Sequence, residues 1–444
     1  MYNETVMKRN RVFISEYESE ARLREPDSFS LPSLRLFQKR NELLLNGMDG
    51  LTIAMLEDGD TIITRKPLPE EYLRYWSANI RSISNFSPRA GSETEPLSVY
   101  QLLEQDSEAS FILKQSQIVN YAAVPEYFEL CRTIGITPES PSLSLIRQLN
   151  SKAYSNELRI RLDLPAKGIH LQSPQEYDAC IYRMLEEWGT LLIKDSMGVS
   201  GKGIMEIDSS GIAERIGNHF HRQMEEGKKH FDFILEPKLN RKTDFSCQFH
   251  ITRYGEVVID GYQKNASKGY AYLGSGSLSQ DEQNLIRASG YVETIQTVAA
   301  DMASLGFYGY ACTDSMITMD DRVIPLLEIN PRMSMARFNL NLETMLGQKC
   351  RLCSHEGIRG DSPDIDTILN ELDEADLLYT KDRGKGVIPL APSIWCVPEA
   401  TQKHVRVYYV IVFDAESEYE KISDSWLAYC AGRICSGTGA KKTA

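Results

Sequence analysis

The most informative stretch of the sequence is Tyr308–Arg337, which reads YGYACTDSMITMDDRVIPLLEINPRMSMAR. Its first part has the pattern of a strand, Met319–Arg322 has the composition of a tight turn, and Val323–Ile329 has the pattern of a second strand. These three parts predict a β-hairpin. Folding the chain at the turn sets Asp314 on one strand close to Glu328 on the other.

The hairpin would therefore oppose two carboxylates, with Asn330 on the same face of its strand as Glu328. Like charges at such positions are destabilising, so a positive partner is expected between them. Mg²⁺ fits this position, because it takes oxygen ligands, usually one or two carboxylates together with substrate phosphates. Arg332 follows the strand, where its planar guanidinium could hold a phosphate. The alternative is a solvated hairpin whose polar residues share no ligand.

Composition limits the class of protein. The 444 residues suffice for roughly two to four domains, and 42% hydrophobic with 25% charged residues is typical of a globular protein. The net charge of −13 argues against general binding of nucleic acid or an anionic membrane. The nine cysteines have no regular spacing and no signal peptide is apparent, so reduced thiols and a cytoplasmic location are expected. No apolar run approaches the ~18–20 residues of a membrane span.

The first segment, residues 1–125, predicts a small α/β domain. Arg11–Ser15 has a strand pattern, Leu34–Leu45 a helical pattern, and Leu51–Thr64 that of a hairpin turning at Gly59. No catalytic constellation stands out in it.

From about Pro125 the pattern alternates between helix and strand. Helical patterns run from Ser142 to Leu162, with Lys152 in their middle. Ser173-Pro174-Gln175-Glu176 is a capping box that begins a helix reaching about Trp188, and Leu191–Lys194 is a short buried strand.

A glycine-rich loop follows that strand, with the sequence Lys194-Asp-Ser-Met-Gly-Val-Ser-Gly-Lys-Gly-Ile204. Its backbone N–H groups could approach phosphate oxygens without hindrance from side chains. It has neither the frame of a Walker A loop nor the third glycine of a dinucleotide fingerprint. A plain hairpin turn is the alternative, although a lysine at the end of the preceding strand favours a phosphate loop.

The next segment predicts strands, a loop and a helix. Phe231–Glu236 is an apolar strand, and Asp244–Thr252 with Val257–Tyr262 forms an antiparallel hairpin. Ser267–Ser279 is predicted to be a loop, either a lid over a substrate or a disordered connection, and Asp281–Met302 one long helix.

The final segment, from residue 346, has a different character. Asp361–Leu378 predicts a surface helix, Gly386–Ala391 and His404–Asp414 predict strands of a small domain, and the tail from Gly437 is expected to be disordered.

The order of these motifs resembles that of the ATP-grasp ligases over about residues 130–345. The matching features are the strand ending in Lys194, the glycine-rich loop, ILEPKL around Glu236, and Asp314 followed by Glu328-x-Asn330-x-Arg332. The resemblance implies an α/β (α+β) fold in which two subdomains, 126–240 and 241–345, clamp ATP. A pre-ATP-grasp domain of residues 1–125 would precede them, and a β-containing domain of residues 346–444 would follow.

The resemblance also implies residue roles. The residues implied in ATP binding are Lys152, Lys194, Gly198, Ser200, Gly201, Lys202, Gly203, Glu236, Lys238, Leu239 and Asp244. Asp314, Glu328 and Asn330 would hold Mg²⁺, two ions in all, for which Mn²⁺ could substitute, and Arg332 would be the catalytic residue at the transferred phosphoryl group. Cys312 stands where several members carry a further arginine, and Arg337 or Lys264 could take over the role of that arginine. Lys264, Ser275 and Arg337 are the candidate substrate residues.

The flanking segments resemble ligases of natural-product biosynthesis. They imply a ligase that activates an amino acid, L-glutamate in particular, as an acyl phosphate. It would join the acyl group to the phosphopantetheine thiol of an acyl-carrier protein, or to an amine, in butirosin-type aminoglycoside antibiotic biosynthesis. Lys228–Lys229 or Lys238–Lys242 could face an acidic carrier protein, although solvated charge runs explain them as well. The chain could also form a homo-oligomer. The alternatives are a peptide ligase acting on free amino acids, and a non-catalytic ATP-binding regulator.

Overall fold

The computed structural model describes residues 10–17, 19–32, 47–89, 98–198, 203–359, 364–395 and 404–435. They form two compact units, each assembled from separated segments. The first unit comprises residues 1–17, 42–139 and 338–444, and the second comprises 18–41 and 140–337. The sequential domains expected from the sequence, with boundaries after residues 125 and 345, stay a prediction.

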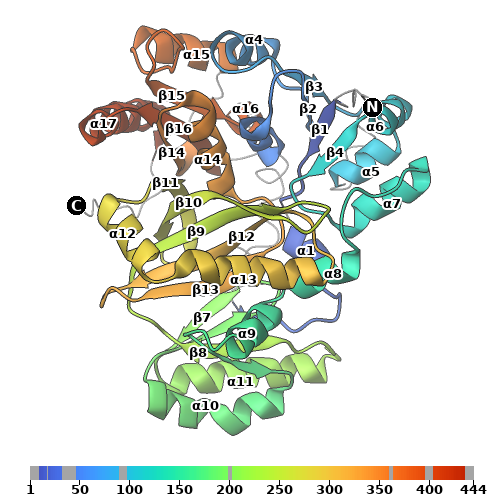
Figure 1. The fold of residues 1–444 in the computed structure, drawn as a ribbon, viewed down its shortest axis with the longest axis vertical. Coiled ribbons are helices and arrows are strands. Elements are labelled where there is room, and N and C mark those ends of the chain that lie inside the picture. Colours follow the sequence, from blue (N-terminus) through green and yellow to red (C-terminus); the bar gives the residue numbers. More distant parts are fainter. Residues whose placement is uncertain are drawn as a thin grey trace, which may run out of the picture. The chain divides into compact units, whose positions relative to one another are not determined.

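The first unit contains a parallel sheet in the order β3–β2–β1–β4 (Figure 1). Its strands are β1 (Arg11–Ile14), β2 (Thr61–Ile63), β3 (Ser84–Phe86) and β4 (Gln117–Asn120). Its helices are the 3-10 helix η1 (Met48–Met55), α4 (Glu70–Asn79), α5 (Val99–Glu104), α6 (Ser107–Gln115) and α7 (Pro125–Ile134). Parallel strands joined through helices make this part α/β.

The hairpin predicted for Leu51–Thr64 is wrong. Its first half is the buried helix η1, and β2 pairs in parallel with β1 instead of folding back. Gly59 has a φ of 86° directly before β2, a conformation that glycine adopts without a steric penalty. The helix predicted for Leu34–Leu45 lies outside the described residues.

The C-terminal part of the first unit forms antiparallel strands in the order β14–β16–β15. The elements are α14 (Met335–Leu346), β14 (Lys349–Arg359), α15 (Ile365–Glu374), β15 (Gly386–Leu390), α16 (Pro392–Trp395), β16 (His404–Phe413), α17 (Glu416–Arg433) and β17 (Ile434–Cys435). The two strands and the helix predicted here are confirmed. The predicted disordered tail from Gly437 lies outside the described residues.

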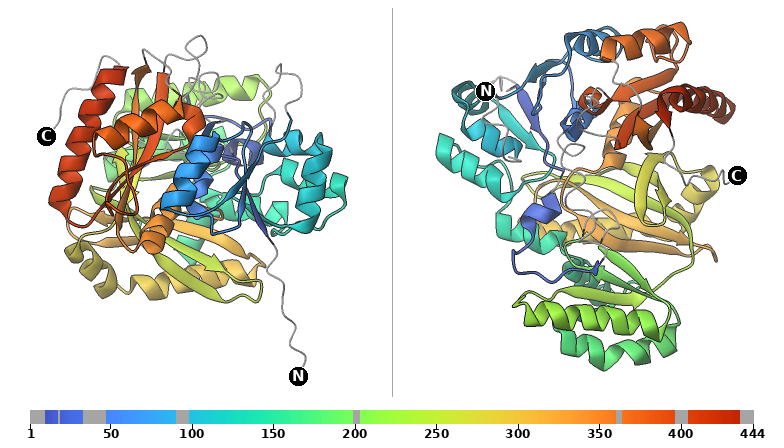
Figure 2. Two further views of the ribbon diagram at one scale, coloured as in Figure 1. Left: turned by 90° about the horizontal axis from the view of Figure 1, so that it is seen from above. Right: turned by 180° about the vertical axis from the view of Figure 1, so that it is seen from behind.

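The second unit contains two sheets, the first in the order β5–β8–β6–β7. Its elements are β5 (Ile169–Leu171), α10 (Pro174–Trp188), β6 (Leu191–Asp195), β7 (Ile204–Ile207), α11 (Ser210–Glu225) and β8 (Phe233–Pro237). Ser173 caps α10 as predicted, and its hydroxyl accepts from the Glu176 backbone N–H. Both helices cover one face of the sheet, which is also visible from behind in Figure 2, and pack on it through an aromatic cluster around Phe220 and Phe233.

The second sheet of this unit runs in the order β13–β12–β9–β10–β11. Its elements are β9 (Arg241–Ile251), β10 (Val257–Lys268), β11 (Ala271–Gly276), α12 (Gln280–Ala288), α13 (Tyr291–Ser304), β12 (Gly309–Thr318) and β13 (Val323–Asn330). The helices α1 (Ser19–Leu23), α8 (Leu143–Asn150) and α9 (Lys152–Arg161) complete the unit. α13 packs on one face through Tyr291, Ile295 and Val298, against core side chains such as Phe245.

Two predictions for this region are wrong. Ser267–Ser279 is not a loop, because β10 continues to Lys268 and β11 pairs antiparallel with it. The long helix is interrupted between Ala288 and Tyr291, where Gly290 takes a φ of 69°. The alternating Tyr-x-Gly-x-Gly residues of β11 gave too weak a strand signal for its pairing to be predicted.

Within the described part of the chain, no helix has both the length and the apolar character needed to cross a membrane.

Candidate active site

The hairpin predicted from the sequence is confirmed, and its register opposes the two carboxylates. β12 and β13 pair antiparallel, with Asp314 opposite Glu328 and Cys312 opposite Asn330. Directly opposed residues share one face of a sheet, so these four side chains lie on the same face. The opposite face carries the apolar core beneath α13.

Neighbouring strands extend the same polar face. Asp314 is opposite Ser246 on β9, which is in turn opposite Gln263 on β10. Ser246, Gln248 and Gln263 are all buried and polar. Gln248 Nε2 donates to Ser246 Oγ at 2.9 Å, and Ser334 Oγ donates to Gln248 Oε1 at 2.8 Å. The polar face therefore forms a connected hydrogen-bonded surface around the hairpin carboxylates.

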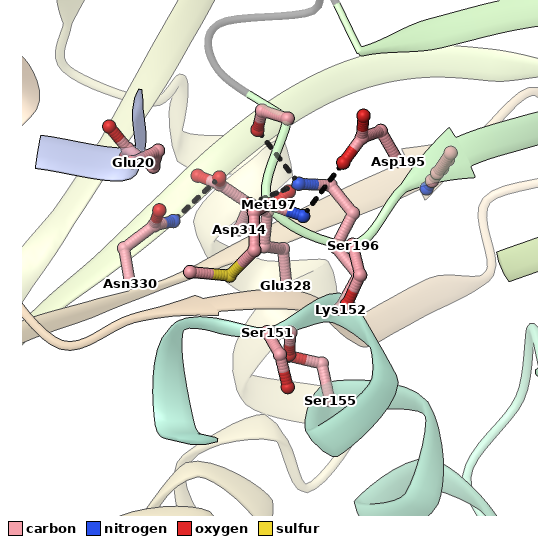
Figure 3. Close-up of polar contacts among 12 residues, drawn as sticks. Glu20, Ser151, Lys152, Ser155, Asp195, Ser196, Met197, Asp314, Glu328 and Asn330 are labelled. Carbon is pink, nitrogen blue, oxygen red and sulfur yellow. Dashed lines mark hydrogen bonds and ion pairs between the residues drawn. The ribbon is translucent and has the colours of Figure 1, made fainter. Parts of the chain in front are cut away.

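The hairpin residues fit a divalent cation. Burial and then the charge of Glu328 raise the pKa of Asp314 to about 7, because both disfavour the ionised form of this carboxylate. Asn330 Nδ2 donates to Asp314 Oδ2 at 3.1 Å, as Figure 3 shows. Two carboxylates and a carboxamide oxygen form the hard oxygen set that Mg²⁺ prefers. Among the described residues no three His, Cys, Asp or Glu side chains gather as a metal site, so this candidate consists of the two carboxylates with the amide.

Lys152 connects the hairpin to the glycine-rich loop. It is the first residue of α9, which Ser151 caps by accepting from the Tyr154 backbone N–H. Its buried Nζ lies 2.9 Å from Glu328 Oε1 and 3.0 Å from the carbonyl oxygen of Gly198 (Figure 3). A cation in this position can meet both a phosphate held by the loop and a carboxylate of the hairpin.

The second predicted lysine lies in a buried ion-pair cluster. Lys194 Nζ is 2.5 Å from Glu236 Oε1, and Arg159 Nη2 is 3.1 Å from Glu236 Oε2. All three side chains are buried. Burial alone would raise the pKa of Glu236, but the charges of Lys194 and Arg159 lower it below its ordinary value. Arg159 was missed by sequence reasoning, because nothing in its helix distinguishes it from a surface arginine.

The glycine-rich loop joins the antiparallel strands β6 and β7, so it is a hairpin connection, and its binding of phosphate stays a prediction. The Asp195 N–H donates to the Gly203 carbonyl at 2.8 Å, which brings the ends of the loop together. A Cβ added at Gly198 would lie 2.7 Å from the Cα of Gly203, and one at Gly203 would lie 2.6 Å from the Cα of Gly198. The close approach of the two strands thus requires glycine at both positions. Three predicted residues of this loop, Ser200, Gly201 and Lys202, lie outside the described part of the chain.

The remaining predicted nucleotide residues lie after β8 and on β9. Lys238 Nζ is 2.7 Å from Glu206 Oε2, and Glu206 also accepts from the Tyr270 hydroxyl at 2.6 Å. Leu239 follows and is half-buried. Asp244 lies on the polar face and is 2.6 Å from Arg241 Nη1. Its pKa is raised, mainly by burial.

Arg332 forms an ion pair that the sequence did not predict. Its Nε donates to Glu20 Oε1 at 2.8 Å, its Nη2 also pairs with Glu20, and Nη2 donates to Asn330 Oδ1 at 3.2 Å. Burial alone would raise the pKa of Glu20, but the charge of Arg332 lowers it. Glu20 precedes Arg332 by 312 positions, and no local pattern marks it.

The candidate substrate residues are divided between the two faces of the second sheet. Ser275 lies on the polar face, because it is opposite Asn265, which is opposite Asp244. Lys264 lies on the other face, where it pairs with Glu282 at the start of α12 at 2.8 Å. The structure therefore does not bring Lys264 to the hairpin carboxylates.

Arg337 is the better placed of the two candidate cations. It is buried, pairs with Asp260, and stacks over the Tyr310 ring with its guanidinium carbon 4.5 Å from the ring centroid. Burial, more than any neighbouring charge, raises the pKa of the Cys312 thiol to about 12, while the nearby Arg332 and Arg337 act against this rise. The charges of both arginines thus act at Cys312, the position where several ATP-grasp ligases are expected to carry a further arginine.

We compared the chain with protein-family models and with curated proteins. No protein-family model matches the chain. It is 24% identical over 208 residues to the [butirosin acyl-carrier protein]–L-glutamate ligase of Niallia circulans, a match that covers 46% of this chain and 48% of that ligase. The chain thus spans about half the length of the curated relative it matches.

Solved structures match over nearly the whole chain. The biotin carboxylase of Campylobacter jejuni has a TM-score of 0.56 at 12% identity, covering 94% of this chain and 91% of that one. The biotin carboxylase domain of the Hydrogenobacter thermophilus 2-oxoglutarate carboxylase has a TM-score of 0.55 at 14% identity, with coverages of 97% and 91%. An N5-carboxyaminoimidazole ribonucleotide synthetase has a TM-score of 0.53 at 11% identity, with coverages of 95% and 97%.

The chain has the ATP-grasp fold. The fold prediction is therefore confirmed. Assignment of the β5–β8–β6–β7 sheet and the β13–β12–β9–β10–β11 sheet to the two predicted ATP-clamping subdomains stays a prediction. The roles of individual residues follow as proposals.

Proposed function

We propose that this protein is an ATP-dependent ligase that activates a carboxylate as an acyl phosphate. One observation supports this proposal most directly. Lys152 contacts both Glu328, which is opposite Asp314 in the hairpin, and the carbonyl oxygen of Gly198 in the glycine-rich loop. The candidate cation ligands and the candidate phosphate loop are therefore next to each other. Phosphoryl transfer needs positioning and charge neutralisation more than covalent chemistry from the protein. Lysines, an arginine and opposed carboxylates are the residue types suited to that task.

The first chemical step transfers the γ-phosphoryl group. A carboxylate oxygen of the substrate attacks the γ-phosphorus, the bond to the β-phosphate oxygen breaks, and ADP leaves. Lys152 and Lys194 would hold the phosphates, with the glycine-rich loop closing over them. Asp314, Glu328 and Asn330 would hold Mg²⁺, which supplies charge neutralisation to the phosphate oxygens. Arg332 would stabilise the charge of the transferred group.

The second step forms the new acyl bond. A nucleophile attacks the acyl carbon, inorganic phosphate leaves, and the nucleophile loses its proton. Closure of the glycine-rich loop over the bound nucleotide would exclude water and protect the acyl phosphate from hydrolysis. We assign the role of the further arginine to Arg337, because its charge, unlike that of Lys264, lies on the polar face near Cys312.

Within this class, we propose L-glutamate as the acyl substrate and the phosphopantetheine thiol of an acyl-carrier protein as the acceptor. The support is the likeness to the Niallia circulans ligase, whose name states that activity. An amine of a carrier-bound acyl group would give an amide by the same second step. Since the reaction consumes ATP, we propose that the protein acts in the cytoplasm.

The test is an incubation of the protein with MgATP, L-glutamate and a holo-carrier protein, followed by mass spectrometry. We expect ADP release and a gain of one glutamyl unit on the carrier. A free dipeptide with an unchanged carrier mass would instead identify a peptide ligase. Nucleotide binding without ADP release over all amino acids would identify a non-catalytic regulator and contradict the ligase proposal.

A further inference from the structure

The segment of residues 19–32, which we name the N-terminal strap, belongs to the second unit although it lies far from the rest of that unit in sequence. Phe29 and Leu31 lie in the core beneath the first sheet. Ser28 forms a parallel bridge with His230, and the Phe29 N–H donates to the His230 carbonyl at 3.0 Å. The strap is thus a fixed part of the subdomain that carries the glycine-rich loop.

One end of the strap reaches the carboxylate hairpin on the other subdomain. Glu20 is 4% exposed and accepts from both Nε and Nη2 of Arg332, which fixes the plane of the guanidinium. Ser19 Oγ donates to the second oxygen of Glu20 at 2.9 Å, so the carboxylate itself is held in place. Glu20 is therefore held in one orientation, and through its two contacts it fixes the orientation of Arg332.

Without Glu20, the guanidinium has an alternative partner. Arg332 Nη2 already donates to Asn330 Oδ1 at 3.2 Å, and Asn330 Nδ2 donates to Asp314 Oδ2 at 3.1 Å, so only one side chain separates the guanidinium from the carboxylate pair. A released Arg332 would turn toward that carboxylate pair, because a buried cation without a counter-charge is strongly unfavourable. It would then block the oxygens proposed to hold the cation and would no longer face the phosphoryl group.

The strap makes a second contact, with the base of the glycine-rich loop. Arg24 Nη1 donates to Asp195 Oδ2 at 2.7 Å, and Asp195 Oδ1 accepts from the Met197 N–H at 3.1 Å. Asp195 is almost wholly buried, and the positive charge of Arg24 is the counter-charge that stabilises its carboxylate at the start of the loop. Glu20 and Arg24 thus link the strap to both halves of the proposed nucleotide site.

We propose that Glu20 is a positioning residue for phosphoryl transfer, which aims Arg332 at the transferred phosphoryl group and keeps it off the metal-binding carboxylates. The inference rests on the proposed function, since it gives Glu20 a role in that reaction. Arg24 has the corresponding structural task at the glycine-rich loop.

A double-mutant cycle on the full chain tests the inference. Glu20→Gln keeps the size of the side chain and removes its charge, and Glu25→Gln, an exposed strap carboxylate 3.2 Å from Arg147, is the matched control. We expect kcat to fall about 100-fold in Arg332→Ala and at least about 10-fold in Glu20→Gln. In the Arg332→Ala background, Glu20→Gln should change kcat by less than about twofold, because its effect passes through Arg332. Glu25→Gln should retain wild-type kcat.

Two independent, multiplying losses would overturn the proposal, as would unchanged kcat in a Glu20→Gln protein. Thermal unfolding shows whether each variant is folded, and Glu20→Asp gives a second variant that keeps the charge but shortens its reach. If Glu20 acts by orienting Arg332, kcat should also fall in Glu20→Asp, because the shorter side chain cannot make both contacts with the guanidinium. If it retains full activity, charge alone is sufficient and the positioning role is rejected.

A binding measurement separates this inference from the proposed ligase activity. Calorimetric titration gives the ratio of ATP to ADP affinity in the presence of Mg²⁺ without turnover. Arg332→Ala and Glu20→Gln should lower this ratio by similar factors, and Glu25→Gln should leave it unchanged. Absence of ADP release in the wild type would reject the ligase proposal, whereas an unchanged affinity ratio in Glu20→Gln would reject the role of Glu20.

Discussion

Single residues set the electrostatics of the site. Asp314 and Glu328 are opposed in one hairpin, and each has a different polar partner: Asn330 for Asp314 and Lys152 for Glu328. Each contact reduces the repulsion between the carboxylates without removing it, since the charge of Glu328, after burial, still acts to raise the pKa of Asp314. Such a frustrated pair is typical of a site built for a ligand and not for stability.

Glu328→Gln should therefore abolish most activity while leaving the fold intact. We expect turnover to fall by a factor of about 100 or more, because the variant removes a charge from the proposed cation site. The free energy of unfolding should change by less than about 1 kcal/mol, since relief of repulsion offsets the weakened contact with Lys152. Steady-state kinetics and urea unfolding measure the two effects. Asp320→Asn, in the exposed hairpin turn, is the control, and equal turnover in Glu328→Gln and Asp320→Asn would refute the metal assignment.

Lys264 has a structural role at the other face of the sheet. Burial alone would raise the pKa of Glu282, but hydrogen bonds from Lys264, Thr243 and the Ser279 backbone lower it to about 2. Because this value lies below the ordinary 4.5, the carboxylate stabilises the fold above about pH 4.5, and that stabilisation is lost as the pH falls toward 2.

Urea unfolding of the wild type and Glu282→Gln between pH 3 and 7 should show this dependence. The wild-type advantage should be full at neutral pH and shrink as the solution is acidified. Lys264→Ala should lower stability while leaving the KM for the acyl substrate within about twofold. A large rise in KM with unchanged stability would restore Lys264 as a substrate residue.

At the scale of elements, the glycine-rich loop depends on the close approach of two strands. Gly198 and Gly203 meet at the base of the loop, where either added Cβ would strike the backbone of the opposite strand. The base of the loop therefore requires both glycines, whatever ligand the loop binds.

Gly198→Ala should weaken MgATP binding by about tenfold or more if the loop holds the phosphates as proposed, because the added Cβ would push the two ends of the loop apart. Gly211→Ala is the control: it lies in the first turn of α11 with nothing within 4 Å of its Cβ. That substitution should be neutral or stabilise by about 0.5–1 kcal/mol. Calorimetric titration measures the affinities, and equal MgATP affinity in both variants would show that the loop does not hold the phosphates.

At the scale of the whole molecule, neither unit is continuous in sequence. The second unit takes Phe29, Leu31, Glu20 and Arg24 from the strap, more than a hundred residues before its main segment begins at residue 140. Chain continuity is therefore a poor guide to where the chain can be cut.

A fragment of residues 126–345 should fail to fold cooperatively, because it lacks the strap and leaves part of the first-sheet core exposed. The loss of Phe29 alone should cost about 3–5 kcal/mol. Circular dichroism during urea unfolding measures this, and the control is the same fragment with residues 18–32 attached through a flexible linker. Cooperative unfolding of the bare fragment at full-length stability would contradict the prediction.

The sequence alone determined the parts of this protein that are local. The carboxylate hairpin, the capped helix after Ser173, the strand ending in Lys194 and the glycine-rich turn all depend on residues within a few positions of one another, so their patterns predicted them. Two elements with weak local signals were not predicted. Pairing with β10 makes residues 271–276 a strand, and the left-handed conformation of Gly290 breaks the predicted long helix.

Tertiary structure decided what meets those parts. Glu20 reaches Arg332, Arg159 shares Glu236 with Lys194, and Lys264 turns to the face away from the hairpin. These outcomes depend on which faces of separate elements pack together, and burial of apolar surface, a non-directional force summed over the whole unit, decides that. The sequence could therefore name candidate residues for the chemistry, whereas the ion pairs that orient them follow only from the packed chain.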